Sequence, residues 1–173
     1  YVLALSRWDR GRNLSFLLEI AEKVKKAKFV VAGAFTPFEV EAEFRSEVNA
    51  RGLTDRIDIV PNLTEYLINF LYNHALVTLR WGDEGFGMDV LESAANACPA
   101  ILQKQLGASE IIQHGENGFI VDGLNADAFA NHISTLVNDK HLAEKIGTQA
   151  WKLSKQFTWE NHAKALAELC LQV

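Results

Sequence analysis

Short apolar runs alternate along this chain with longer segments in which apolar residues recur at helical spacing. Six runs rich in β-branched and aromatic residues predict strands at residues 2–5, 29–32, 57–60, 75–79, 100–102 and 119–121. The second run, Phe-Val-Val-Ala, is apolar throughout, as expected of a strand that is covered on both faces of its sheet. The pattern therefore predicts a sheet buried between two layers.

Amphipathic segments fill the gaps between the predicted strands, at residues 14–24, 38–50, 64–72 and 88–97. This alternation of strand and helix predicts a parallel sheet of about six strands with helices on both faces, a Rossmann-like doubly wound α/β fold. C-terminal helices are expected at residues 126–138, 141–156 and from Trp159 onward, the last capped by Thr158. Ligands of such sheets bind beyond the carboxyl ends of the strands, so the candidate site lies in the loops there.

Composition narrows the classes of function. The 173 residues, 49% of them hydrophobic, suffice for a single domain, residues 1–173, with a substantial core. A formal charge of −5 argues against nucleic acid, because phosphate backbones are bound through an excess of lysine and arginine. No apolar run approaches the roughly 20 residues that cross a bilayer, so we expect a cytoplasmic domain without direct membrane contact. A longer protein that contains it could still be peripheral to the membrane.

The cysteines and histidines favour neither a disulfide framework nor a metal site. Cys98 and Cys170 lack the spacing of a thiolate zinc site, and the five histidines include no His-x-x-x-His pair. We therefore expect no metal. Met88 is the only methionine, so we also expect that Tyr1 is not a translation start and that the chain is part of a longer protein.

The strongest candidate for chemistry is segment 81–92, which follows the predicted fourth strand and runs into a helix. It contains Gly85 and Gly87 between two glutamates, Glu84 and Glu92. Glycines let a ligand approach the main chain, and the N–H groups at a helix start favour an anion. Were residues 84–92 wholly helical, the two carboxylates would lie about 12 Å apart along the axis, beyond the roughly 5 to 9.5 Å of a glycoside-cleaving pair. They suit two ends of one elongated ligand better, although a tight turn with solvated or helix-capping glutamates fits the same residues.

This segment resembles the Glu-x7-Glu signature of the retaining glycosyltransferases called group 1 or family 4. Other segments match the family in order and spacing over nearly the whole chain. They are Ser6-Arg7-Trp8, residues 30–33, 107–110 and 115–121, and residues 157–160. The family has the GT-B fold, two Rossmann-like domains facing across a cleft, and this chain is similar to the C-terminal, donor-binding domain. The resemblance implies that the N-terminal, acceptor-binding domain is absent from the chain.

The resemblance also implies roles for the matching positions. Glu84 would contact the donor sugar near the reacting carbon, as the catalytic residue, and Glu92 would hydrogen-bond the ribose. The other implied donor-site residues are Arg7, Arg12, Gly85, Phe86, Gly87, Met88 and Asp89. Arginine suits a diphosphate, because its planar fork donates paired hydrogen bonds to phosphate and stays charged. Arg10, in the same turn, is expected to be a surface residue.

Several positions depart from the family pattern. Arg80-Trp81 stands where a Pro-Ser pair is common, Ala97 replaces a glycine before Pro99, and Leu106 replaces the first of two glycines before Glu110. Asp89 puts a carboxylate where the diphosphate should approach. If the Asp89 side chain points away, only its N–H matters; otherwise donor affinity falls.

The resulting hypothesis is a metal-independent, retaining hexosyltransferase of polysaccharide or glycoconjugate biosynthesis. Its donor would be a nucleotide-diphosphate sugar, UDP- or GDP-linked, with no other cofactor. Its acceptor would be a glycan or lipid-linked glycan bound through the missing domain, so the isolated chain should bind donor but turn over little. Two alternatives stay open: a non-catalytic nucleotide-sugar-binding module and a GT-B-like sugar-nucleotide epimerase.

Overall fold

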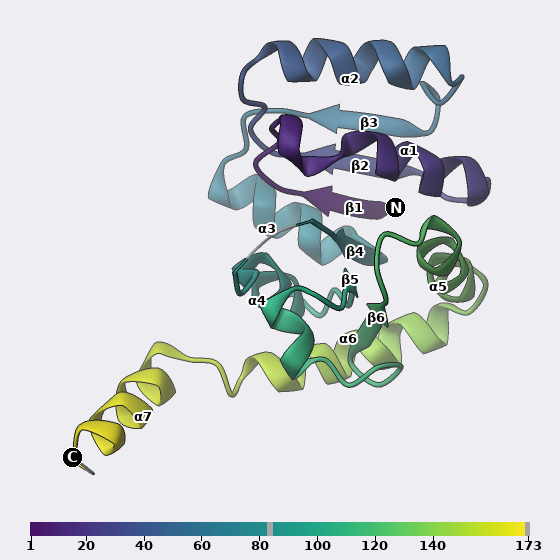
Figure 1. The fold of residues 1–173 in the computed structure, drawn as a ribbon. Helices are drawn as coiled ribbons and strands as arrows, with labels where there is room; N and C mark the ends of the chain where they lie inside the picture. Colours follow the sequence, from purple (N-terminus) through teal and green to yellow (C-terminus); the bar gives the residue numbers. More distant parts are fainter. Residues whose placement is uncertain (83–84, 172–173) are drawn as a thin grey trace.

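The computed structural model describes residues 1–82 and 85–171. Within these ranges, six parallel strands form one sheet in the order β3-β2-β1-β4-β5-β6 (Figure 1). The strands are β1 (Val2–Leu5), β2 (Phe29–Ala32), β3 (Ile57–Val60), β4 (Val77–Arg80), β5 (Ala100–Gln103) and β6 (Gly118–Val121). This is the strand order of the Rossmann fold, so the predicted fold class is confirmed.

Seven α-helices and two short 3₁₀ helices connect or follow these strands in the described parts of the chain. They are η1 (Arg10–Arg12), α1 (Leu14–Lys23), α2 (Glu39–Ala50), α3 (Glu65–His74), α4 (Met88–Ala95), η2 (Gly107–Ile111), α5 (Ala126–Asn138), α6 (Lys140–Ser154) and α7 (Trp159–Leu171). None of them is both long enough and apolar enough to cross a membrane.

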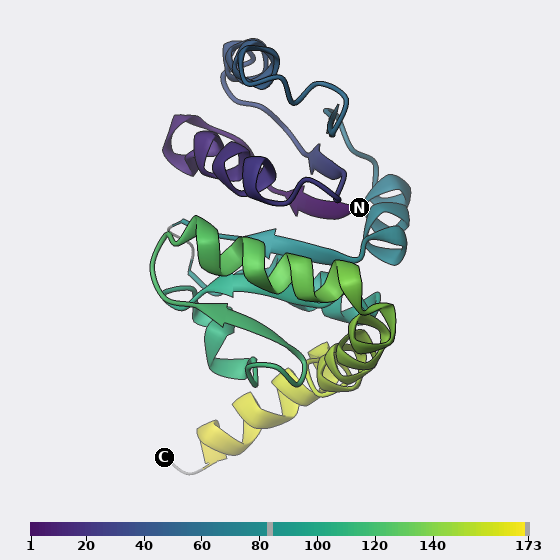
Figure 2. The same cartoon turned by 90° about the vertical axis from the view of Figure 1, so that its right-hand side faces the viewer.

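Helices cover both faces of the sheet because successive strand residues point to opposite sides. Val2 and Ala4 of β1 belong to the larger apolar core, which α1, α2 and α5 complete, whereas Leu3 packs with Leu71 and Tyr72 of α3. Figure 2 shows α1 and α3 on opposite sides of the sheet. The continuous apolar runs of the sequence are therefore explained by burial from two sides.

The sequence located the elements well, and the differences lie at their ends. The fourth strand begins at Val77 and not at Ala75, because the Ala75 N–H still bonds to α3 carbonyls, those of Leu71 and Tyr72. Helix α4 stops at Ala95, two residues early, because Ala97 adopts a left-handed conformation with φ of 54°. The 3₁₀ helices η1 and η2 were not predicted.

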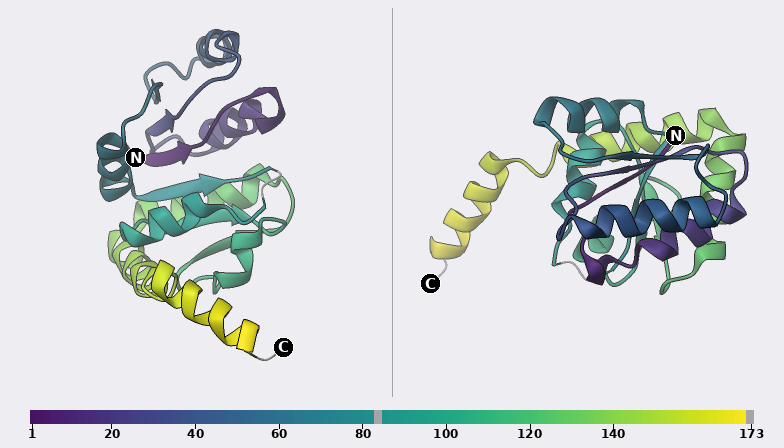
Figure 3. Two further views of the ribbon diagram at one scale, coloured as in Figure 1. Left: turned by 90° about the vertical axis from the view of Figure 1, so that its left-hand side faces the viewer. Right: turned by 90° about the horizontal axis from the view of Figure 1, so that it is seen from above.

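Helix α7 projects from the rest of the chain in each view (Figures 1 and 3). None of its residues is buried; Trp159 is 84% exposed, and Leu166 and Leu169 are more than half exposed. Its apolar side chains thus lack a packing partner within the described residues.

Candidate functional site

The strand order reverses between β1 and β4, and a cavity of about 380 Å³ opens beyond the carboxyl ends of these two strands. Doubly wound sheets bind ligands at this switch point. The cavity is lined by Leu5, Ser6, Arg7, Arg12, Arg80, Met88 and Asp89. The fold thus brings Arg7 and Arg12 together with the first turn of α4, although about 75 residues separate them in the chain.

The loop that carries Arg7 is fixed against the end of β2. The Ser6 N–H donates to the Ala32 carbonyl at 3.1 Å, and the indole of the buried Trp8 donates to the same carbonyl at 2.9 Å. The two chain segments touch so closely that a Cβ on Gly33 would lie 1.8 Å from the Ser6 carbonyl oxygen. Gly33 has a φ of 130°, so both space and backbone require glycine here.

Arg12 ends the turn η1, which is held from the β4 side. The Trp81 indole N–H donates to the Arg12 carbonyl at 3.0 Å, and the Trp81 and Trp8 rings pack with centroids 5.8 Å apart. The Trp81 position departs from the family pattern, yet its side chain supports the arginine loop. The loop geometry is therefore set by packing, and the charged side chain of Arg12 is half-buried at the cavity.

The glycine loop, residues 85–87, is held by main-chain contacts with η2. The Gly107 N–H donates to the Gly85 carbonyl at 3.0 Å, and the Ala108 N–H donates to the Phe86 carbonyl at 2.6 Å. A Cβ on Gly107 would lie 2.5 Å from the Gly85 carbonyl oxygen. This close approach explains why position 107 requires a glycine, a requirement that could not be inferred from the sequence.

Helix α4 starts at the cavity without a side-chain cap. Gly87, with φ of 88°, is its N-cap, so the first N–H groups of the helix have no capping side chain to accept from them. Met88 and Asp89 in this first turn line the cavity, whereas Gly85 and Phe86 are exposed beside it. Such a helix start favours an anion.

Asp89 faces Arg80. Its Oδ2 lies 3.0 Å from the Arg80 Nε, and the Arg80 Nη1 donates to the Ser6 hydroxyl at 2.9 Å. The Arg80 side chain is only 6% exposed and the Asp89 carboxylate 22%. No role for Arg80 was predicted from the sequence. The signal that could have indicated one is that Arg80 and Asp89 carry opposite charges, depart from the family pattern, and lie at the ends of elements that meet at the switch point.

Of the two glutamates of the signature, Glu92 belongs to the described residues and stands apart from this group. Glu84 lies outside the described residues, so its predicted contact with a sugar stays a prediction. Glu92 is exposed on α4, does not line the cavity, and its carbonyl accepts from the Asn96 side chain at 2.9 Å. Since α4 begins at Met88, the wholly helical spacing considered for residues 84–92 does not apply, and the ribose role of Glu92 also stays a prediction.

Two carboxylates of α4 act electrostatically on Tyr72, a buried residue of α3. Burial, followed by the nearby charges of Asp89 and Glu92, raises the pKa of the Tyr72 phenol well above its usual value. Tyr72 therefore stays protonated at physiological pH. In the described parts of the chain, no three His, Cys, Asp or Glu side chains gather as metal ligands would.

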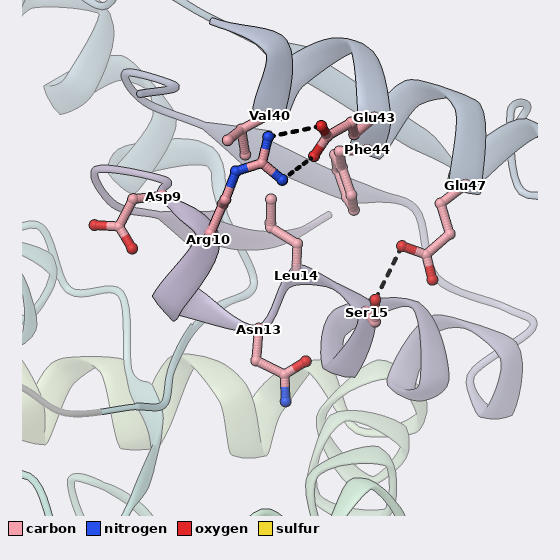
Figure 4. Close-up of a pocket in the computed structure, with 9 residues that line it drawn as sticks. All are labelled: Asp9, Arg10, Asn13, Leu14, Ser15, Val40, Glu43, Phe44 and Glu47. Atoms are coloured by element: carbon pink, nitrogen blue, oxygen red, sulfur yellow. Dashed lines mark hydrogen bonds and ion pairs between the residues drawn. The ribbon is translucent and has the colours of Figure 1, made fainter. Parts of the chain in front are cut away.

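A second cavity, of about 270 Å³, lies between α2 and the start of α1 (Figure 4). Its charged residues are Asp9, Arg10, Glu43 and Glu47, and Arg10 forms a two-pronged ion pair with Glu43 at 2.8 and 2.9 Å. Arg10 is a surface residue, as predicted, with its side chain 64% exposed. The charged residues named here sum to a formal surplus of negative charge, which disfavours a phosphate group in this cavity.

Comparison with known proteins agrees with this geometry. Residues 1–153 match the family model described as Glycosyl transferases group 1. The D-inositol 3-phosphate glycosyltransferase of Corynebacterium glutamicum (strain R) is 30% identical over 169 residues, which cover 97% of this chain and 38% of that protein. The chain thus spans well under half the length of this relative.

Solved structures share this fold. The C-terminal domain of the group 1 family glycosyl transferase LpcC from Francisella tularensis is 26% identical, with a TM-score of 0.77, and the match covers 90% of this chain and 85% of that one. Anabaena HepE, crystallised in complex with UDP, superposes with a TM-score of 0.88 at 19% identity, over all of this chain and 49% of HepE. The fold is that of a GT-B glycosyltransferase domain, and the chain belongs to the glycosyl transferases group 1 family.

Proposed function

We propose that this chain forms the donor site of a retaining glycosyltransferase that transfers a hexose from a nucleotide-diphosphate sugar to an acceptor hydroxyl. The observation that carries the proposal is the arginine-lined cavity at the switch point, where Arg7, Arg12 and the uncapped start of α4 converge. A diphosphate is the ligand whose charge fits both features. HepE, which shares this fold, was crystallised with UDP, and that supports a nucleotide donor.

The same groups suit the departure of the leaving group. When the bond between the anomeric carbon and the phosphate oxygen breaks, negative charge grows on the nucleoside diphosphate. The guanidinium groups of Arg7 and Arg12 are hydrogen-bond donors whose geometry matches phosphate, and N–H groups already aimed at the site need no reorganisation. We therefore expect arginines and the helix start to carry this charge without a metal ion.

The sugar end of the donor would lie along the glycine loop. Gly85 and Phe86 are exposed there, and their carbonyls accept hydrogen bonds from η2. We therefore expect their N–H groups and the Glu84 carboxylate to bind the sugar hydroxyls. Glu84 would orient the anomeric carbon so that the acceptor oxygen attacks on the face that the phosphate leaves. Retention of configuration is the expected outcome.

A second domain would supply the acceptor. Helix α7 presents Trp159, Leu166 and Leu169 away from the sheet without a covering partner among the described residues, which supports a further packing surface elsewhere in a longer protein. The HepE chain, of which the match covers 49%, is long enough for such a domain. The isolated chain should accordingly bind donor without efficient transfer.

Calorimetric titration with UDP and with GDP tests the donor site. Wild type should bind one of them, and Arg7→Gln/Arg12→Gln should weaken binding at least about 100-fold, since each charged hydrogen-bond partner contributes about 1.5 to 3 kcal/mol. Arg10→Gln is the control: it removes one arginine charge from the same loop, but Arg10 faces Glu43 and does not line the cavity. Equal losses in both variants would reject the assignment.

Transfer itself is tested on a longer protein that contains this chain. Glu84→Gln should abolish transfer while leaving UDP affinity largely intact, and NMR of the product of an α-linked donor should show an α-linkage. Unchanged transfer by Glu84→Gln would refute the role of Glu84. Conversion of the nucleotide sugar without any acceptor would indicate an epimerase, and binding without turnover would indicate a binding module.

A further inference from the structure

Arg80 is an unusual residue for its place, because a charged side chain at the end of a buried strand is costly. Its side chain is 6% exposed, and an isolated buried charge costs several kcal/mol, so it needs partners. Asp89 and Ser6 provide them, through the contacts at 3.0 and 2.9 Å. The three residues come from β4, from α4 and from the loop that follows β1, and all three line the switch-point cavity.

An ion pair that served only to join β4 to α4 would be weak evidence of function, because apolar residues of similar volume pack as well or better. The position of this pair argues for more. Arg80 and Asp89 both line the cavity that contains Arg7 and Arg12. The described lining of this cavity includes three arginines, and a guanidinium group is a suitable hydrogen-bond donor to a phosphate.

The ion pair also explains how a carboxylate at position 89 is compatible with a diphosphate ligand. A carboxylate in the first turn of α4 competes with any anion for the helix start, and its repulsion would weaken donor binding. With Arg80 Nε at 3.0 Å, that charge is compensated within the protein. The two departures from the family pattern, at positions 80 and 89, thus compensate each other.

We propose, on the basis of the donor function proposed above, that Arg80 is a third diphosphate-binding arginine and that Asp89 is its positioning residue. Asp89 forms an ion pair with the guanidinium on its Nε side, and Nη1 donates to the Ser6 hydroxyl, so these two contacts restrict the position of the group before donor binds. In the donor-free protein, the Asp89 carboxylate compensates the buried charge of Arg80. When donor is bound, the phosphates bring further negative charge to the guanidinium.

The test is a cycle of three variants of the whole chain, Arg80→Met, Asp89→Asn and Arg80→Met/Asp89→Asn, titrated with UDP, GDP and uridine. Thermal unfolding establishes that each is folded, and the double variant removes both charges of the Arg80–Asp89 pair together. Arg80→Met should bind the preferred diphosphate most weakly, because Asp89 then repels the phosphates. The double variant should recover part of that loss yet remain about 10-fold or more below wild type. Uridine, which lacks phosphate, should bind all variants alike.

A double variant that binds the diphosphate as tightly as wild type would show that the pair only joins β4 to α4. The role of Asp89 has its own readout: Asp89→Asn should raise affinity in the Arg80→Met background but not in the Arg80 background. The same fold-change in both backgrounds would overturn it. If wild type binds neither UDP nor GDP, the proposed donor function is rejected. If wild type binds a diphosphate and only the double variant has the same affinity, the donor function stands and the inference about Arg80 and Asp89 is rejected.

Discussion

Gly107 holds the glycine loop through a contact that leaves no room for a side chain, which makes Gly107→Ala a sharp perturbation. The added Cβ would lie 2.5 Å from the Gly85 carbonyl oxygen and 3.0 Å from the Phe86 Cα. Comfortable contacts to carbon are about 3.5 to 4.0 Å, so the loop and η2 must separate by about 1 Å. Gly107 does not have a positive φ, so this contact is the only source of the effect.

The separation would lengthen two hydrogen bonds, from Gly107 to Gly85 and from Ala108 to Phe86. Each contributes about 1 kcal/mol, and the crowding adds a cost that the exposed loop relieves in part. We expect a loss of about 2 kcal/mol in the free energy of unfolding, a fall of about 4 to 8 °C in Tm, and at least about 10-fold weaker binding of the preferred nucleoside diphosphate.

Thermal and urea unfolding measure the stability, and calorimetry measures the affinity. Gly85→Ala adds the same methyl group to the glycine loop, but no heavy atom of the described residues beyond its chain neighbours lies within 4 Å of its Cβ position, so its stability should stay within about 0.5 kcal/mol of wild type. If Gly107→Ala has the stability and the affinity of wild type, the claimed contact does not hold the loop.

Three further predictions concern other parts of the chain. Ala97→Gly should stabilise by about 0.5 to 1 kcal/mol in urea unfolding, since φ of 54° is strained for alanine and the residue is exposed; destabilisation would contradict this. Burial, and then the charge of His114, lowers the pKa of His132 in the folded state. As the pH falls below about 6.5, the unfolded state therefore binds the proton first, and the free energy of unfolding decreases. His132→Phe keeps the stack on Phe119 and should lose less Tm between pH 7.5 and 5.5; an identical loss would refute the titration. EDTA should leave UDP affinity unchanged, because arginines carry the charge; lost binding would point to a metal.

The fold could be predicted from the sequence because its signals are local. Each strand is a short apolar run, and the alternation with amphipathic segments specifies a parallel sheet covered on both faces. Element ends depended on interactions that periodicity does not encode: the Ala75 N–H is bonded back to α3, and Ala97 turns left-handed after α4.

The site was predictable only in part. Arg7, Arg12, Met88 and Asp89 do meet in one cavity, because strand ends on either side of the switch point converge whatever the sequence distance. A role for Arg80 could not be predicted, since it depends on an ion pair with Asp89 that forms only in the folded structure. Glu92 matches the family signature, yet its side chain is exposed outside the cavity, so spacing alone did not determine its surroundings.

A crystal structure of the chain with its preferred nucleoside diphosphate is the most direct test of the donor site. Both phosphates should lie in the switch-point cavity, with hydrogen bonds from Arg7, Arg12 and the first N–H groups of α4. Phosphates in the second cavity, beside Arg10 and Glu43, or phosphates at the switch point without contact to Arg7 or Arg12, would contradict the account.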